Sequence, residues 1–349
     1  MSSAEPLSEF ANYLEAKRIG IVYSDRFSGE LAETWYHRWK TNVIAFFSQA
    51  VEGVKAHPVF FNVDQFISFC SAYDNPNLAF VVNLNAGNRF LDNWAVVPAL
   101  CQWRGIPVFP STAMTVMLGE NKVLSKIVAH QLGWRIPRSI HDTPEVIDRF
   151  IMKPATFGSS VGMQEIDRRV AGSISVADTV IEEFIPGFDL TLVLLYSSVE
   201  RDLVCMGAQA TVPIIAHPET WTLNAFEKRH PGVRTPVEEL LCPVEDELAS
   251  KSVSLGKLYG SRALTRIDAR VSRKPEKKVP IHFGDCTFLE INPMPTVGPT
   301  NSVTKFAQEF ISANRGHPSL AWLERVQGSP VDLAACYILV CGLYAISSK

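Results

Sequence analysis

The sequence lacks the features that mark secreted proteins and nucleic-acid-binding proteins. Its seven cysteines include no CxxC pair, and the first ten residues, MSSAEPLSEF, have neither the basic start nor the apolar core of a secretory signal. We therefore expect reduced cysteines, several of them buried, and a cytoplasmic location. The net charge of −3 at pH 7 offers no basic surface, so we expect no nucleic-acid partner.

Long hydrophobic runs are also scarce. The segment LAACYILVCGLYAI, at residues 333–346, has about 14 residues, whereas a membrane-spanning helix needs about 20. It is better interpreted as a buried terminal helix or as one side of a homodimer interface, and we expect no membrane partner. A chain of 349 residues, 47% hydrophobic and 20% charged, suits a globular enzyme with two or three packed subdomains.

Strands and helices alternate along the chain, which predicts the α/β fold class. Residues 18–23 (RIGIVY), 79–84 (AFVVNL) and 106–109 (IPVF) are apolar runs typical of buried parallel strands. Residues 93–104 form a helical stretch between the last two of these strands. A second helical stripe of apolar residues covers 121–132.

The second half of the chain predicts a larger α/β region. Its strands are expected at residues 191–196 (TLVLLY), 263–271 (ALTRIDARV) and 286–291 (CTFLEI). A loop-rich stretch at 212–243 lies between the first two. A structureless connection of that length is usually functional or disordered.

Two motifs in this sequence carry chemistry. KPATFGSSVGM, at residues 153–163, places a lysine and a loop of small residues after a strand, which suits a polyphosphate because backbone amides can approach it closely. In FLEINP, at residues 288–293, Glu290 and Asn292 face one side of a strand, and their oxygens suit a hard cation such as Mg²⁺. Taken alone, the first motif is more often a simple turn and the second more often solvated.

The segment LTRIDARV, at residues 264–271, makes the combination stronger. Its alternating apolar and charged residues predict a strand with Arg266 and Asp268 on one face. Asp268 would join Glu290 and Asn292 in an oxygen-rich Mg²⁺ set, so the three segments together indicate Mg-nucleotide chemistry. For Arg266, the alternative is a structural salt bridge with Asp268 or Glu290.

These segments resemble the motifs of the ATP-grasp ligases, and within them those of the D-alanine–D-alanine ligases. The resemblance covers roughly residues 105 to 305, with the motifs in the family order and at family-like spacings. The matching segments are ENKVLSK (120–126), similar to the family's DKxxSK helix; KPATFGSSVGM (153–163), to its KPxxxGSSVGM loop; IEEFIPGFDLT (181–191), to its adenine-and-ribose segment; TRIDARV (265–271), to its GRIDxxx strand; and FLEINPMPTVGPTNSV (288–303), to its LLEANTxPGMTxxSL strand.

The resemblance implies the ATP-grasp fold, in which an N-terminal parallel-sheet α/β subdomain precedes two α+β subdomains that sandwich the nucleotide. It divides the chain into an N-terminal substrate domain (1–110), a central ATP-grasp subdomain (111–184), a C-terminal catalytic subdomain (185–330) and the apolar C-terminal helix (331–349). Residues 212–243 match the lid that closes over the nucleotide phosphates in the family.

The resemblance also implies which residues meet the phosphates of ATP. Lys153 should contact the α- and β-phosphates, Lys122 should supply a second cation, and Lys228 in the lid should reach the γ-phosphate. Ser159 and Ser160 should meet substrate as well as phosphate. For Lys122 the alternative is a solvated helix lysine, and for Lys228 an ordinary loop lysine.

The adenine and ribose are implied to lie on the segment IEEFIPGFDLT. Glu182 should line the adenine, and backbone groups of Glu183 and Ile185 should read its edge. Asp189 should accept hydrogen bonds from the ribose hydroxyls. The alternative for Glu182 and Asp189 is that both are surface acids near a strand.

The implied reaction passes through an acyl phosphate. A carboxylate attacks the γ-phosphate of ATP, ADP leaves, and an amine then displaces phosphate. Because two anions must approach each other, cations must neutralise both. Asp268, Glu290 and Asn292 are implied to hold two Mg²⁺ ions, with Mn²⁺ as an alternative metal, and Arg266 to stabilise the transition state.

The part of the resemblance that concerns the amino-acid substrates is weaker. Arg229 follows the lid lysine where the family has an aromatic residue, and Glu30 is a weak stand-in for the family's EREVS-like glutamate. Asn85 begins an Asn-Ala-Gly segment in place of the family's His-Gly. Ser302 is the match to the serine that holds the second substrate's carboxylate, although this motif has one extra residue.

Three hypotheses follow for the activity. The first is an ATP-dependent carboxylate–amine ligase with changed small amino-acid substrates, for example an amide-forming step in specialised metabolism. The second is a divergent D-alanine–D-alanine ligase of peptidoglycan synthesis. The third is a nucleotide-binding regulator or partner subunit without turnover, which the intact set of Lys153, Arg266, Asp268, Glu290 and Asn292 argues against.

Overall fold

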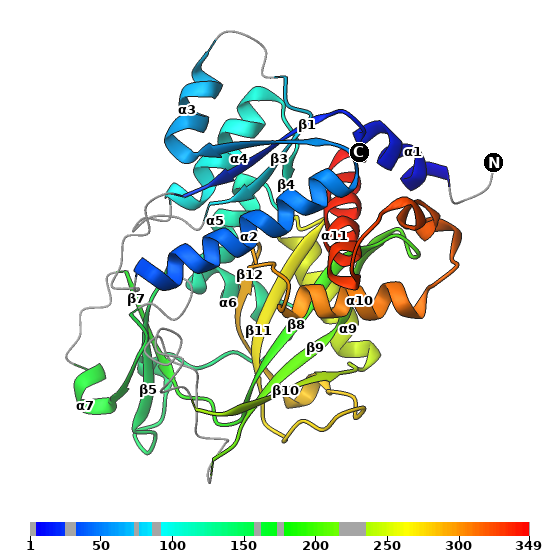
Figure 1. Cartoon of the computed structure of the whole chain (residues 1–349). Helices are drawn as coiled ribbons and strands as arrows, with labels where there is room; N and C mark the ends of the chain where they lie inside the picture. Colours follow the sequence, from blue (N-terminus) through cyan, green and yellow to red (C-terminus); the bar gives the residue numbers. More distant parts are fainter. Residues whose placement is uncertain are drawn as a thin grey trace.

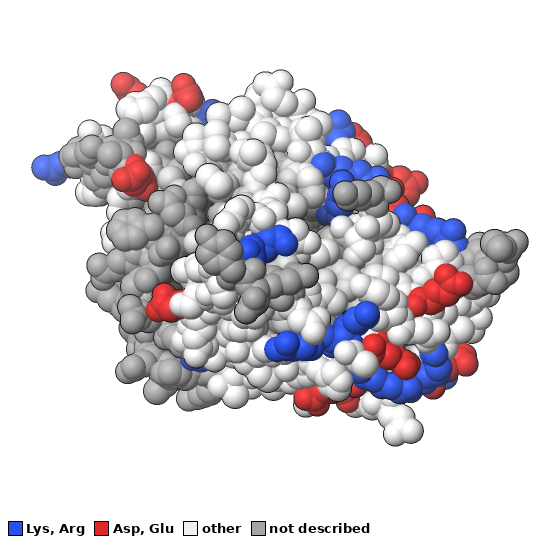
Figure 2. Space-filling model, turned by 90° about the horizontal axis from the view of Figure 1, so that it is seen from above, with Lys and Arg blue, Asp and Glu red and all other residues white. Residues whose placement is uncertain are grey.

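The chain folds around three β-sheets with helices packed against them, as the computed structural model in Figure 1 shows. Figure 2 shows one face, on which lysine and arginine are interspersed with acidic residues. The structure describes residues 5–24, 33–72, 77–85, 92–156, 162–172, 178–215 and 235–348.

Sheet A is the parallel sheet of the N-terminal part, with the strand order β2-β1-β3-β4. β1 (Arg18–Tyr23) and β3 (Phe80–Leu84) are its central strands, and most of their residues are buried because helices cover both faces. The other elements here are α1 (Glu5–Leu14), α2 (Glu33–Gly53), β2 (His57–Asn62), α3 (Val63–Ser71), α4 (Asp92–Arg104) and β4 (Val108–Phe109).

Sheet C is a small antiparallel sheet with the order β6-β5-β7. Its core consists of Ile140, Phe150, Ala171 and Ile181. The elements of this region are α5 (Ala113–Glu120), α6 (Lys122–Gln131), η1 (Ile140–Asp142), β5 (Arg149–Pro154), β6 (Gln164–Asp167), α7 (Arg168–Ala171) and β7 (Thr179–Glu183).

The ends of α6 follow from its sequence. The side chain of Asn121 caps the helix, because its Oδ1 accepts hydrogen bonds from the backbone N–H groups of Val123 and Leu124, each at 3.0 Å. Gly133, directly after the C-cap residue Leu132, has a φ of +85°, a conformation that glycine adopts without strain. The predicted helical stripe is confirmed, and this cap fixes where Lys122 begins the helix.

Sheet B is a five-stranded antiparallel sheet with the order β10-β9-β8-β11-β12. It differs from the sequence prediction in two places. β9 was not among the expected strands, and the stretch 212–243, expected to be loop, contains β10 (Val237–Cys242), which pairs with the end of β9. β10 is an edge strand with exposed Glu238 and Glu239, so its sequence lacks a strand's apolar pattern. The other strands are β8 (Phe188–Ser197), β9 (Asp202–Pro213), β11 (Leu264–Val271) and β12 (Cys286–Asn292).

The apolar C-terminal segment forms the helix α11 (Pro330–Ser347), which is long and apolar enough to cross a membrane by those criteria alone. It instead packs against α2, α10 (Ser302–Ala313) and β8, and the side chains along its middle are buried in the largest hydrophobic core (Figure 1). The interpretation as a buried helix is therefore confirmed. The remaining helices are α9 (Asp246–Leu258), η4 (Phe283–Asp285) and η5 (Pro318–Arg325).

Candidate functional site

The predicted catalytic and metal-binding residues of sheet B meet at one place. In the antiparallel pairing of β11 with β12, Arg266 lies opposite Asn292 and Asp268 lies opposite Glu290. A shift of register follows Asp268, so the strand is irregular at this point. We call these four residues the β11–β12 corner. The sequence prediction that places them together is consistent with this register.

Within the corner, Arg266 and Asp268 form an ion pair. Nη2 of Arg266 lies 2.7 Å from Oδ2 of Asp268, and Nε lies 3.2 Å from the same oxygen. Thr191 donates to the other carboxylate oxygen at 3.0 Å. Burial alone would lower the pKa of Arg266, but the neighbouring carboxylate of Asp268 raises it, so the guanidinium stays charged. The salt bridge considered for Arg266 is thus present in this structure.

Glu290 faces a cation supplied by α6. Nζ of Lys122 lies 3.5 Å from Oε2 of Glu290, and both side chains are largely buried. Burial favours a raised pKa for Glu290, but Lys122, Lys153 and Arg266 outweigh it and lower the pKa to about 2. The carboxylate is therefore ionised at any pH at which the protein would work.

The corner is chemically suited to Mg²⁺. No group of three or more His, Cys, Asp or Glu side chains that could hold a metal occurs in the described part of the chain. The oxygen donors here are two carboxylates and one carboxamide, and Mg²⁺ commonly takes only one or two carboxylates because phosphates and water complete its shell. The ionised Glu290 provides the negative charge that such a cation needs, so the donor set fits.

Lys153 lies at the end of β5 and is held by a buried carboxylate. Glu182 of β7 lies between two lysines: its Oε1 is 2.5 Å from Nζ of Lys153, and its Oε2 is 2.8 Å from Nζ of Lys126 on α6. All three residues are less than 9% exposed. We call them the Lys–Glu–Lys chain. It gives the Glu182 side chain a partner on each oxygen, in addition to its predicted place beside the adenine.

The pKa values in this chain follow from burial and pairing. Burial would raise the pKa of Glu182, but Lys126 and Lys153 lower it, so Glu182 is ionised. Burial alone would lower the pKa of Lys153. The pKa is nevertheless raised, because Glu182 and the more distant Glu290 favour the charged ammonium. Burial dominates at Lys126 and lowers its pKa to about 8. Two positive charges therefore share one negative charge at pH 7.

The remaining predicted nucleotide residues lie where sheet C joins sheet B. The carboxylate of Glu183 pairs with Arg138, with 2.6 Å between Oε2 and Nη2, and its backbone N–H donates to the Arg138 carbonyl at 3.0 Å. Arg270 donates to the Ile185 carbonyl at 3.1 Å and to Oδ1 of Asp189 at 2.6 Å. The side chain of Asp189 remains 27% exposed, so it is accessible to a ligand.

Two residues with an expected role towards the amino acids lie within the described structure. Asn85 is buried just beyond β3, where its backbone N–H donates to the side-chain oxygen of Asn83 at 3.1 Å. The amide nitrogen of Asn83 in turn lies 3.3 Å from the sulfur of Met294, which follows β12. Ser302 begins α10. The other predicted site residues lie outside the described residues: Glu30, Ser159, Ser160, Lys228 and Arg229.

Sequence reasoning missed two residues of the site, Lys126 and Glu120. Glu120 ends α5, which approaches β12 so closely that a Cβ on Gly119 would lie 2.8 Å from the ring of Pro293. The Glu120 side chain is buried, and its Oε1 has no hydrogen-bond partner among the described residues. Both residues belong to ENKVLSK, and this membership is the signal that could have identified them.

Glu120 differs in its charge state from the other carboxylates nearby. Burial is the main cause that raises the pKa of Glu120 to about 8. The positive charges of Lys122 and Arg266 act to lower this pKa, whereas the negative charges of Glu290 and Asp268 act to raise it. The carboxyl group is therefore mostly protonated at pH 7. It places a neutral acid within electrostatic reach of the β11–β12 corner.

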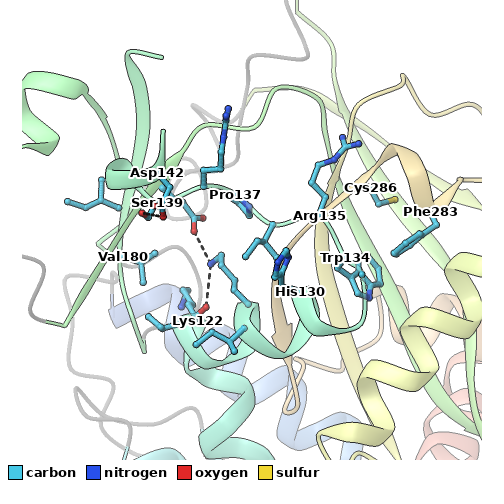
Figure 3. A pocket seen from close by; sticks show the side chains of 18 of the residues that line it. Lys122, His130, Trp134, Arg135, Pro137, Ser139, Asp142, Val180, Phe283 and Cys286 are labelled. Carbon is cyan, nitrogen blue, oxygen red and sulfur yellow. Dashed lines mark hydrogen bonds and ion pairs between the residues drawn. The ribbon is translucent and has the colours of Figure 1, made fainter. Parts of the chain in front are cut away.

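A cavity of about 880 Å³ lies beside the Lys–Glu–Lys chain. Figure 3 shows α6 below it with Lys122 and His130, Pro137 above, Val180 of β7 on the left, and Trp134 with Phe283 on the right. Lys126 and Glu182 also line it, whereas no residue of the β11–β12 corner does. We call it the α6 cavity.

Comparison with characterised proteins gives one relative at the level of sequence. No protein-family model matches the chain. A D-alanine–D-alanine ligase of Wolbachia pipientis subsp. Culex pipiens (strain wPip) is 26% identical over 167 residues. This match covers 43% of the chain and 51% of the relative, so the chain spans about half the length of the curated relative it matches.

Solved structures match over most of the chain. The D-alanine–D-alanine ligase of Bacillus anthracis complexed with ATP has a TM-score of 0.57 and 16% identity, covering 89% of this chain and 96% of its own. The VanG D-Ala:D-Ser ligase of Enterococcus faecalis has a TM-score of 0.59 and 14% identity, covering 95% of this chain and 100% of its own.

The comparisons agree with the arrangement of sheets A, B and C. A parallel sheet followed by two antiparallel sheets is the architecture that the resemblance implied. The chain has the ATP-grasp fold and is similar, in that fold and in part of its sequence, to the D-alanine–D-alanine ligases.

Proposed function

We propose that this protein is an ATP-dependent carboxylate–amine ligase that joins small amino acids through an acyl phosphate and releases ADP and phosphate. The observation that carries the proposal is the β11–β12 corner, with Lys122 at 3.5 Å from Glu290 and Lys153 within the same charged cluster. These are the cations and oxygen donors that phosphoryl transfer to a carboxylate requires. The fold shared with ATP-dependent D-alanine ligases supports the same reaction class.

In the first step, a carboxylate oxygen of the first substrate attacks the γ-phosphorus of ATP. The bond between the γ-phosphorus and the bridging oxygen breaks, and ADP leaves. Lys153 and Lys122 would hold the phosphates, with Lys228 of the lid on the γ-phosphate. Asp268, Glu290 and Asn292 would hold Mg²⁺ or Mn²⁺, which when bound neutralises phosphate charge and orients the leaving group.

In the second step, the amine of the second substrate attacks the acyl carbon. A C–N bond forms, the bond from carbon to the phosphate oxygen breaks, phosphate leaves, and the nitrogen releases a proton. Arg266 would stabilise the oxyanion of this addition; its charge and its position in the same corner support this role. For that role it must reach the substrate while it remains tied to Asp268 on its own strand.

We propose further that the substrates differ from two molecules of D-alanine. Asn85 stands where the family has a histidine, and its backbone N–H donates to the side chain of Asn83, which in turn contacts the sulfur of Met294. Arg229 replaces an aromatic residue beside the lid lysine, which favours a first substrate with an acidic or strongly polar group. Ser159, Ser160 and Glu30 would contact that substrate, and Ser302 the carboxylate of the second.

The alternative is a divergent D-alanine–D-alanine ligase. It is favoured by the sequence match to such a ligase and by the ligase folds in the comparison. The two candidates share the nucleotide half of the site, so only the substrates distinguish them.

The test is turnover of ATP with a panel of D- and L-amino acids, presented singly and in pairs. Nucleotide products are separated by chromatography, and the amide product is identified by mass spectrometry. We expect ADP and phosphate to form with acidic or hydroxylated amino acids more than with D-alanine. AMP and pyrophosphate would contradict the acyl-phosphate route, and a clear preference for D-alanine would favour the alternative.

A further inference from the structure

The α6 cavity combines apolar walls with a buried cation. Val123 and Ile127 of α6, Ile136 and Pro137 of the following linker, and Val180 of β7 contribute apolar surface. Lys126 lies between this surface and Glu182, and only 7% of the residue is exposed. At about 880 Å³, the cavity has the size of small-molecule sites, which are typically apolar with a few placed polar groups.

In the Lys–Glu–Lys chain beside the cavity, cations outnumber carboxylates by one. Arg135, Arg138 and Asp142 also line the cavity, and Arg138 is paired with Glu183. Lys122 pairs with Glu290 and Arg266 pairs with Asp268, one cation to one anion each. The Lys–Glu–Lys chain has two cations for the single carboxylate of Glu182. A buried positive charge in excess favours an anion that can reach it.

The anion should enter from the cavity at Lys126. Of the two predicted phosphate lysines that the structure describes, Lys153 does not line the cavity, and Lys122, which does, is paired with Glu290. Lys126 lines the cavity and has no predicted role towards the phosphates. Lys126 and Lys153 contact different oxygens of Glu182, so this carboxylate lies between Lys126 at the cavity and Lys153. The apolar walls around Lys126 would accept the body of an organic ligand and leave its charged group at the ammonium.

We propose that the α6 cavity is a regulatory site for a small organic monoanion with an apolar body, such as an aromatic or branched aliphatic carboxylate. The bound carboxylate pairs with Lys126 and withdraws it from Glu182. Glu182 then interacts more strongly with Lys153, its other partner at 2.5 Å, and Lys153 becomes less available to the phosphates. The ligand therefore weakens nucleotide binding; this coupling rests on the proposed function, whereas binding to the cavity does not.

The coupling must be reciprocal because it is a difference of binding free energies. A nucleotide that draws Lys153 towards its phosphates leaves Glu182 to Lys126 alone. Lys126 then has a stronger partner and binds an anion in the cavity less well. Coupling between sites commonly changes affinity by roughly 5- to 150-fold, and we expect the low end of this range because only one ion pair is shared.

The test compares 2-naphthoate with its neutral analogue 2-naphthamide, by calorimetry on the full chain. We expect the wild type to bind naphthoate at least tenfold more tightly than the amide. Lys126→Met should bind both equally, because it keeps the length of the side chain and loses the charge. Lys257→Met is the control: Lys257 is half exposed and pairs with Asp202, away from the cavity, so the preference should persist.

A second variant tests the cavity even if Lys126→Met does not fold. Ile127 lines the cavity but is 54% exposed, so Ile127→Trp should fold normally, narrow the cavity and weaken both ligands at least fivefold. Melting curves check each variant. The proposal is overturned if wild type shows no saturable naphthoate binding, or if the preference for naphthoate survives in Lys126→Met.

The coupling arm repeats the titration with a non-hydrolysable ATP analogue and Mg²⁺. We expect the dissociation constant of naphthoate to rise about fivefold and then level off at saturating analogue, with the converse shift for the analogue. Complete displacement without a plateau means that naphthoate occupies the nucleotide site, which overturns the proposal. Naphthoate binding without any analogue binding would count against the proposed function and leave the cavity as a site.

Discussion

At the scale of single residues, the carboxylates of the site have distinct roles that their sequence positions alone do not reveal. Glu290 and Asp268 lie opposite each other on paired strands, and Glu182 forms ion pairs with both Lys126 and Lys153. Glu120 is buried, its Oε1 has no hydrogen-bond partner among the described residues, and the side chain is mostly protonated at pH 7. Substitutions of these acids should therefore have different effects, although all four are largely buried.

Glu290→Gln and Asp268→Asn should each lose most ligase activity while the fold survives. Each substitution removes a negative charge from the proposed metal ligands, which lie opposite each other in the paired strands β11 and β12. Loss of a metal bridge removes several kcal/mol of transition-state stabilisation, so turnover should fall roughly a hundredfold or more. The measurement is turnover of ATP with the best substrate pair, with circular dichroism to check folding.

Glu239→Gln serves as the matched control for these two variants. Glu239 lies on the edge strand β10 and pairs with Lys305 at 2.7 Å, away from the corner, so its loss should leave turnover within about twofold of wild type. Near wild-type turnover of Glu290→Gln or Asp268→Asn would show that the corner is structural only.

Glu120→Gln should stabilise the protein increasingly as pH rises. The folded pKa is about 8, above the ordinary 4.5 of the unfolded chain, so the folded state retains a proton that the unfolded state releases. Wild-type stability should therefore fall between pH 4.5 and pH 8, by about 1.4 kcal/mol per pH unit from this group. Glutamine has no proton to lose, so the free-energy difference between variant and wild type should widen over that window.

Denaturant unfolding at pH 5, 6, 7 and 8 measures this difference. Glu120→Met, also neutral at every pH, should show the same trend with pH even if its absolute stability differs. A constant difference across the four pH values would mean that Glu120 titrates as an ordinary carboxylate.

At the scale of elements, sequence patterns were informative where one physical effect dominates. Buried parallel strands are apolar throughout, so β1 and β3 were predictable, and the apolar stripe and terminal glycine of α6 located that helix. β2 and β10 were not predictable, because an edge strand need not bury either face continuously. The sequence also did not predict the Lys–Glu–Lys chain, because its three residues come from α6, β5 and β7 and meet only through tertiary contacts.

The start of α6 links helix stability to the site. Asn121→Ala should remove the cap from two N–H groups and lower the free energy of unfolding by about 1 kcal/mol. Fraying of the first turn also moves Lys122, whose backbone N–H donates to the Ala155 carbonyl at 2.9 Å and so connects α6 to the segment KPATFGSSVGM, the proposed phosphate site. We therefore expect weaker binding of an ATP analogue, by at least threefold.

Asn62→Ala is the matched control for the cap. Asn62 caps α3 in the same way, by accepting from the N–H of Gln65 at 2.7 Å, but α3 lies on sheet A away from the phosphate side. Both variants should lose similar stability in denaturant unfolding, and only Asn121→Ala should lose nucleotide affinity. Equal nucleotide binding in the two variants would show that the α6 cap matters for folding alone.

At the scale of the whole molecule, α11 joins the parts that carry the site. The largest core contains residues of sheet A, of sheet B and of α11 in one continuous cluster. Gly342 allows a close approach: a Cβ there would lie 2.3 Å from Phe109 of β4 and 3.5 Å from Ala263, just before β11. Only glycine allows the helix to lie against both at once. The C-terminal segment therefore sets how the N-terminal sheet sits on the sheet of the β11–β12 corner.

Gly342→Ala should accordingly destabilise the whole molecule. The added methyl group meets the rigid ring of Phe109, and overpacking of this kind costs about 1–3 kcal/mol. Gly284→Ala is the control, because a Cβ there has nothing within 4 Å, so its stability should be close to that of wild type. Because one core spans both sheets, tryptophan fluorescence and circular dichroism should report one shared transition, shifted to lower denaturant in Gly342→Ala. Separate transitions for the two probes would show that sheet A unfolds independently and that α11 does not couple it to the site.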